Sequence, residues 1–262
     1  MVNEMIFRLR HPCNYHAERI LMRVIDVIKD YRCGCIALSG GIDTSVILLA
    51  SLKTGFKPRG YIAIYREGVP RDLIYAEYLS KILNVDLRYV FIDPAETNLL
   101  RDEVVRCIGP EKIDSHGDGG CIEIRNDIVF YTTLKKTKEN GCECVYVGSG
   151  GDEIFAGYSF MLNLTEQDLE KKIDSMIRGR YPEIELSRCL GVEVVAPFLD
   201  PRVLEFATQI PINCLRTGSM TGKDILREIL ATNNLYLISE RRKTPAESGA
   251  GTISICRSIY DT

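Results

Sequence analysis

The chain has 262 residues, of which 45% are hydrophobic and 26% charged, a composition that suits a globular protein with a sizeable core. Its formal net charge is −3 at pH 7 and its pI is about 5.8, so it lacks the basic excess of a general nucleic-acid binder. Because no apolar run approaches the roughly 18 residues that cross a bilayer, and charges interrupt residues 1–10, we expect a cytoplasmic protein with neither a membrane span nor a signal peptide.

Short apolar runs alternate with helical stripes over the first 160 residues. A helical stripe over residues 20–28 comes first, and a strand at 35–38 leads through a glycine turn into a helix that ends near residue 53. The elements expected next are a strand at 61–65, a helix at 71–83, a strand at 87–92, a loop at 108–120, a helix at 121–139 and a strand at 144–147. This alternation predicts a doubly wound, mostly parallel α/β sheet with helices on both faces.

The pattern changes beyond residue 160. Helices are predicted at 165–178, 201–209, 221–231 and 245–260, with prolines at 182, 197, 211 and 245. We therefore predict a single domain over residues 1–262, with an α/β nucleotide-binding part at 1–160 and a mainly helical part at 161–262.

Residues 39–45, with the sequence SGGIDTS, lie where the first strand passes into its helix. Gly40 and Gly41 allow a sharp turn that brings backbone N–H groups close to a ligand, and the helix directs its positive end to the same point. Hydroxyl donors are added by Ser39, Thr44 and Ser45. The segment predicts a cradle for a pyrophosphate-sized anion, and the carboxylate of Asp43 predicts a Mg²⁺ ion between protein and phosphates. The alternative is an ordinary strand–turn–helix junction without a ligand.

A second motif follows the fourth strand and contains Gly150, Asp152 and Glu153. Ligands of open α/β sheets bind at the carboxyl ends of strands, where the strand order reverses. If the first and fourth strands are neighbours, Asp43 and Asp152 face each other and form a Mg²⁺ site that also holds a nucleotide phosphate. Taken alone, Asp152 also suits a helix N-cap followed by a first-turn acid.

Four segments carry a family resemblance and occur in the order SGGIDTS (39–45), GSGGDEIFAGY (148–158), APFLDPRVLEFA (196–207) and TGKDILRE (221–228). Together they resemble the synthetase domain of the asparagine synthetase family, an ATP pyrophosphatase (PP-loop) domain with an adenine nucleotide α-hydrolase-like fold. The sequence begins only about 38 residues before the first motif, so the resemblance covers this domain without the glutaminase domain that usually precedes it. We therefore expect free ammonia, or a separate glutaminase subunit, as the nitrogen source.

The resemblance implies an AMP-forming amide synthetase with ATP and Mg²⁺ as cofactors. A carboxylate, aspartate by resemblance only, would attack the α-phosphorus of ATP, release pyrophosphate and form an acyl-adenylate that an amine then converts to an amide. Asp43 and Asp152 would hold Mg²⁺, and Lys223 would neutralise charge on the α-phosphate. The residues implied to hold ATP or pyrophosphate are Ser39, Gly40, Gly41, Asp43, Thr44, Ser45, Gly150 and Lys223.

One departure affects the second half-reaction. The family loop reads SGEGSDE, and its first acid, thought to assist amide formation, falls on Ser149 of this chain. Serine without an adjacent base is a poor proton acceptor, so either Glu153 or Glu123 substitutes for the acid or the acceptor differs. Two alternatives stay open: a PP-loop transferase that installs sulfur or an amine on RNA, which the acidic pI disfavours, and a nucleotide-binding regulatory subunit without turnover. The oligomeric state is also open, with a homodimer as the usual arrangement.

Three further polar residues have two interpretations each. Asp200 is interpreted as a helix N-cap before Pro201 rather than as a site residue. Arg241 and Lys243 either reach phosphate or belong to a solvated charge cluster.

The ten cysteines are expected to be mostly reduced and buried, as in other cytosolic chains. If the first and fourth strands are neighbours, their amino ends bring together the two CxC pairs, Cys33 with Cys35 and Cys142 with Cys144. Three interpretations of these four cysteines stay open: buried thiols, a disulfide or a structural zinc site. Cys107 and Cys121 would pair if the loop between them closes.

Overall fold

The computed structural model describes residues 8–113, 119–217 and 222–255. Within these residues five strands form one sheet, with the bounds β1 (Cys35–Ala37), β2 (Arg59–Tyr65), β3 (Leu87–Ile92), β4 (Cys144–Tyr146) and β5 (Glu193–Val195). The strand order is β3-β2-β1-β4-β5, and every neighbouring pair is parallel. The predicted doubly wound parallel sheet is confirmed, and its order reverses between β1 and β4.

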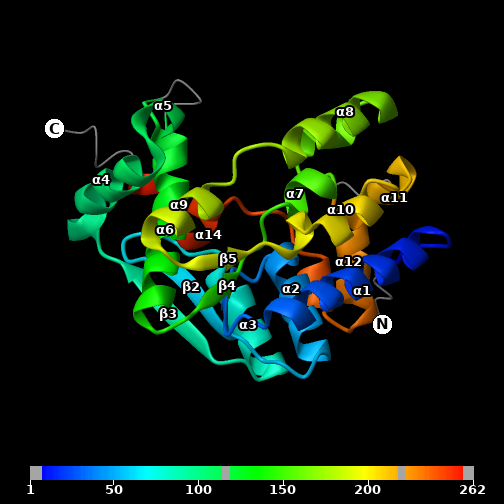
Figure 1. Ribbon diagram of the computed structural model, residues 1–262, viewed down its shortest axis with the longest axis horizontal. Coiled ribbons are helices and arrows are strands. Elements are labelled where there is room, and N and C mark those ends of the chain that lie inside the picture. Colours follow the sequence, from blue (N-terminus) through cyan, green and yellow to red (C-terminus); the bar gives the residue numbers. More distant parts are fainter. Residues whose placement is uncertain (1–7, 114–118, 218–221, 256–262) are drawn as a thin grey trace, which may run out of the picture.

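Helices cover both faces of the sheet, as Figure 1 shows. One face carries α1 (Cys13–Tyr31), α2 (Ile42–Lys53), α3 (Leu73–Leu83) and α12 (Asp224–Thr232). The other carries α4 (Thr97–Ile108), α6 (Cys121–Glu139), α9 (Pro182–Leu190) and α14 (Ala246–Ala250). Side chains alternate between the faces, so Tyr146 packs in the first core cluster and Val145 in the second. Nearly every strand residue is therefore apolar, as expected for a sheet covered on both faces.

The other helices are short, apart from α8. They are α5 (Pro110–Ile113), α7 (Gly151–Ile154), α8 (Glu166–Ile177), α10 (Pro201–Ala207), α11 (Ile212–Leu215) and α13 (Tyr236–Ser239), with 3-10 turns η1 (Pro94–Glu96), η2 (Ser159–Asn163), η3 (Pro197–Leu199) and η4 (Thr252–Ser254). Among the described helices, none combines the length and apolar composition that a bilayer crossing requires.

Most of the expected elements are present, but several elements were not predicted. These include α4, which lies between the strand at 87–92 and the loop at 108–120, and α9 and β5 in the second half of the chain. Because of β5, the part expected to be mainly helical also supplies an edge strand. The helix expected at 245–260 is confirmed only for α14, and its residues 256–260 lie outside the described range, as do 221 and residues 114–118 of the expected loop. Helix α5 occupies part of that loop.

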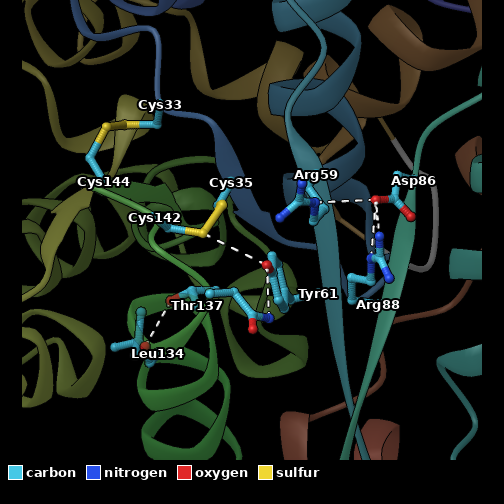
Figure 2. Close-up of a disulfide and its surroundings, with 11 residues drawn as sticks. Cys33, Cys35, Arg59, Tyr61, Asp86, Arg88, Leu134, Thr137, Cys142 and Cys144 are labelled. Atoms are coloured by element: carbon cyan, nitrogen blue, oxygen red, sulfur yellow. Dashed lines mark hydrogen bonds and ion pairs between the residues drawn. A yellow bond between two sulfur atoms is a disulfide. The ribbon is translucent and has the colours of Figure 1, made fainter.

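All nine cysteines within the described residues are oxidised, so the expectation of mostly reduced thiols is wrong. Figure 2 shows Cys33–Cys144 and Cys35–Cys142 close together at the amino ends of β1 and β4, where the two CxC pairs were expected to meet. The predicted Cys107–Cys121 pair is also wrong, because Cys107 is bonded to Cys189 on α9 and Cys121 forms a different disulfide. A further bond, Cys13–Cys214, joins α1 to α11. Because all four sulfurs of the CxC pairs are in disulfides, the interpretation as a structural zinc site is excluded.

Candidate functional site

A cavity of about 1300 Å³ opens at the carboxyl ends of β1 and β4. Ser39 and Asp43, which follow β1, line it together with Ser149 and Asp152, which follow β4. The far wall comes from α6 and from the start of α9, and the segment 242–247 closes the remaining side. The two sequence motifs therefore meet in one cavity at the point where the strand order reverses, as the topology rule predicts.

The glycine turn after β1 is tightly packed. Gly40 has φ +67°, and a Cβ atom there would lie 2.6 Å from the backbone nitrogen of Ala76, so only glycine fits. The N–H of Gly41 donates to Ser39 Oγ at 3.1 Å, and Gly41 is the N-cap of α2. Ser39 and Thr44 line the cavity, whereas the hydroxyl of Ser45 turns back and donates to Gly41 O at 2.6 Å.

Lys223 joins the two motifs. Its Nζ lies 2.5 Å from Asp43 Oδ2 and 2.9 Å from Asp152 Oδ1, and the residue is only 5% exposed. Lys223 is the N-cap of α12 with φ +58°, and its N–H donates to Phe155 O at 3.0 Å. This backbone contact holds the start of α12 against the segment that follows Asp152, so the lysine side chain extends between the carboxylates.

Burial and charge act in opposite directions on this cluster. Burial raises the pKa of Asp43 to about 6, although Lys223 opposes the shift. Burial also acts to raise the pKa of Asp152, but Lys223 and Lys243 outweigh it and hold that pKa below its usual range. Burial acts to lower the pKa of Lys223, yet the two carboxylates raise it overall. Lys223 is therefore a cation at neutral pH, and the cluster is close to charge balance.

The basic segment after α13 has two separate roles. Lys243 Nζ lies 2.9 Å from Asp152 Oδ1 and 3.6 Å from the centre of the Tyr158 ring. Arg241 is buried, pairs with Asp72, and donates from Nη1 to Ser39 O at 3.2 Å. The interpretation as a solvated charge cluster is therefore wrong for Arg241, which is buried and supports the glycine turn. Lys243 is exposed and faces the cavity, so both interpretations stay open for it.

Asp200 has the structural role that its sequence context predicts. It is the N-cap of α10, and its Oδ1 accepts a hydrogen bond from the N–H of Arg202 at 3.0 Å. Asp200 is absent from the residues that line the cavity, and so are five predicted site residues: Gly40, Gly41, Ser45, Gly150 and Lys223. Gly41 and Lys223 line a smaller pocket that shares Ser39, Asp43 and Asp152 with the cavity.

The far wall of the cavity contains charged residues that the sequence did not single out. Arg180 Nη2 lies 3.2 Å from Asp127 Oδ2, and burial raises the pKa of Asp127 to about 7. Glu183, in the first turn of α9, lines the same wall as Glu123, which the sequence did suggest. Pro182 is a helix-start signal, but no local pattern indicates that α9 packs beside the loop after β4.

The model of the asparagine synthase family matches residues 26–190 and 182–255. The chain belongs to this family. A Methanocaldococcus jannaschii protein named "Putative asparagine synthetase (glutamine-hydrolyzing) 1" is 33% identical over 190 residues, covering 68% of this chain and 32% of that relative. The glutamine-hydrolysing asparagine synthetase of Bos taurus is 26% identical over 221 residues, covering 80% of this chain and 38% of its own length.

This member of the asparagine synthase family spans about a third of the length of the two curated relatives. Among solved structures, NMN synthetase from Francisella tularensis aligns over 95% of this chain and 94% of its own, with a TM-score of 0.39 and 15% identity. The matched family region includes both loops that line the cavity and the start of α12, which carries Lys223.

Proposed function

We propose that this protein is an ATP-dependent, AMP-forming amide synthetase. It activates a carboxylic acid as an acyl-adenylate with release of pyrophosphate and then transfers the acyl group to ammonia. The observation that carries the proposal is the buried Asp43–Lys223–Asp152 cluster at the reversal point of the sheet. Membership of the asparagine synthase family supports it, and aspartate is the acid that the names of the relatives suggest.

The residues of the cavity fit a nucleoside triphosphate with Mg²⁺. Asp43 Oδ1 is buried and makes no hydrogen bond to the described residues, so it is free to bind a cation. The described part of the chain holds no group of three ligating side chains, which suits Mg²⁺ because this ion uses one or two carboxylates and completes its shell with phosphates and water. Asp43 and Asp152 would hold the ion, which when bound neutralises phosphate charge.

The remaining residues position and stabilise the reacting groups. Ser39, Thr44 and the N-terminus of α2 face the phosphates, and Lys223 stabilises the negative charge that develops on the α-phosphate. When the substrate carboxylate attacks the α-phosphorus, the bond to the bridging oxygen of the β-phosphate breaks and pyrophosphate leaves. Lys243 adds a second cation next to Asp152.

The nitrogen supply is part of the proposal. The two relatives are named for glutamine hydrolysis, and we propose that a separate glutaminase subunit or free ammonia serves this chain. Assembly as a homodimer stays a prediction.

Pyrophosphate release from ATP and Mg²⁺ tests the proposal, screened over amino acids and other carboxylic acids with and without ammonium. We expect release that depends on one acid, and amide formation that also requires ammonium. Asp43→Asn and Asp152→Asn should each abolish release while circular dichroism shows an intact fold. ATP binding without release for every acid would overturn the proposal and favour a regulatory subunit, and RNA-dependent release would favour an RNA-modifying transferase.

A further inference from the structure

Glu183 and Ser149 lie together in the cavity although 34 positions separate them in the sequence. Ser149 belongs to the loop after β4, three positions before Asp152, and is only 7% exposed. Its Oγ makes no hydrogen bond of regular geometry, yet its hydroxyl is near enough to the Glu183 carboxyl to lower the pKa of that group. Burial has the larger effect, and the pKa of Glu183 is raised overall.

Glu183 differs from the other acids around it. Asp127 pairs with Arg180, and the carboxylate of Glu153 accepts a hydrogen bond from Tyr158 at 2.5 Å. The Arg180 guanidinium therefore occupies Asp127 and the Tyr158 hydroxyl occupies Glu153, so both carboxylates are already engaged. Glu183 forms no ion pair with any described residue, although it lines the cavity, is partly buried, and lies near enough to Arg180 for that charge to lower its pKa.

The second half-reaction of the proposed function requires a proton acceptor. An amine that attacks the acyl carbon becomes positively charged as the C–N bond forms, and this proton must leave before or as the amide is released. A carboxylate whose pKa lies above its usual range and closer to neutral pH accepts such a proton more readily than an ordinary one. Of the two acids suggested from the sequence, Glu153 is engaged by Tyr158 and Glu123 also has a partner within the protein. Glu183, which the sequence did not suggest, lies beside Ser149.

We propose that Glu183 is the general base of amide formation, an inference that rests on the function proposed above. The amine nitrogen attacks the carbonyl carbon of the acyl-adenylate and forms the C–N bond. The bond between that carbon and the phosphate oxygen breaks, and AMP leaves with the electron pair. The proton of the attacking nitrogen passes to the Glu183 carboxylate and then to water. Ser149 provides a hydroxyl that orients the carboxylate.

The variant Glu183→Gln tests this role because glutamine keeps the shape of the side chain but is not basic. We expect acid-dependent exchange between ATP and pyrophosphate, which reports the first half-reaction alone, within about threefold of the unmodified protein, and ammonia-dependent amide formation lower by about 10²–10⁴-fold, the usual contribution of a general base. With hydroxylamine as acceptor, whose conjugate acid is much stronger than ammonium, hydroxamate formation should fall far less. At constant free ammonia, the acidic limb of the pH profile of amide formation should disappear.

Glu185→Gln is the matched control. Glu185 lies on the same helix, does not line the cavity, and pairs with Arg180 and Lys112, so its variant should keep both half-reactions. Unchanged amide formation in Glu183→Gln would overturn the inference, and so would an equal loss of ATP–pyrophosphate exchange and amide formation. If the unmodified protein releases no pyrophosphate with any acid, the proposed function itself is overturned, an outcome distinct from both.

Discussion

Lys223 and Asp43 form an ion pair across 180 positions of sequence, with Nζ 2.5 Å from Oδ2. The same ammonium contacts Asp152 at 2.9 Å, so one buried cation joins the loops after β1 and β4 to the start of α12. Removal of one partner from a buried ion pair leaves the other charge uncompensated, at a cost of several kcal/mol. The geometry of the site therefore depends on a contact between two segments that are far apart in the chain.

Lys223→Met should reduce acid-dependent exchange between ATP and pyrophosphate by at least about 100-fold, because the charge that develops on the α-phosphate loses its cation. Lys53→Met is the control, since Lys53 is an exposed lysine in the last turn of α2. Circular dichroism would establish that both variants are folded. Full exchange activity in Lys223→Met would show that the lysine serves only to neutralise the aspartates.

Gly151→Ala should weaken the binding of Mg²⁺–ATP by at least about tenfold. A Cβ atom at Gly151 would lie 2.2 Å from Asp43 Oδ1, so the carboxylate would have to move from its place opposite Asp152. At Gly34 an added Cβ meets no atom within 4 Å, which makes Gly34→Ala the control. Titration calorimetry measures both affinities, and equal values for the two variants would contradict the predicted displacement.

The disulfides Cys33–Cys144 and Cys35–Cys142 should be strongly non-additive. They close nearly the same loop, of 111 and 107 residues. Loss of both, through alanine at all four cysteines, should lower the free energy of unfolding by about 6–7 kcal/mol, because the unfolded chain is then freed from the long loop, worth about 4.7 kcal/mol, and from the small ring between the two bonds. If only one of the two disulfides is removed, the other still closes the long loop, and only the small ring between the two bonds opens. This loss should lower the free energy of unfolding by about 2 kcal/mol or less. Urea unfolding of the three variants measures this, and a full loss in either single-bond variant would contradict it.

Asp127→Asn should change how stability depends on pH. Burial raises the pKa of Asp127 to about 7, whereas an unfolded aspartate has a pKa of about 3.9. Between about pH 3.9 and about pH 7, the Asp127 carboxyl is therefore protonated in the folded protein but ionised in the unfolded chain. The contribution of Asp127 to stability falls as the pH rises through this range and is constant above it. The free energy of unfolding, relative to the variant, should fall by up to about 4 kcal/mol between pH 4 and pH 8. Urea titrations across this range would contradict the prediction if the difference stayed constant.

The oxidised cysteines also bear on the expected cytoplasmic location, which stays a prediction. Disulfides persist in oxidising compartments, and they also occur in intracellular proteins of hyperthermophiles. Thiol titration of protein taken from its native host under acid quench would distinguish the oxidised from the reduced state.

Much of the site could be predicted from local patterns. The glycine turn, Asp43 and Asp152 were expected at one edge of the sheet because parallel strands place their carboxyl ends together, and this topology also located the CxC pairs. Lys223 was assigned only through the motif around it, since nothing in a lone helix lysine indicates burial. The strand β5 was not predicted because its three residues begin with the charged Glu193 and no glycine-rich turn follows them, unlike β1 and β4.

The sequence by itself determined the order of strands and helices and the residue types at the two strand-end loops, because periodicity and turn chemistry are local properties. Only the tertiary structure decided which distant side chains meet. Cys107 pairs with Cys189, Arg241 with Asp72, and Glu183 lies beside Ser149 because helices and segments far apart in sequence pack together. Contacts of this kind depend on the packing of whole elements, which no window of neighbouring residues records.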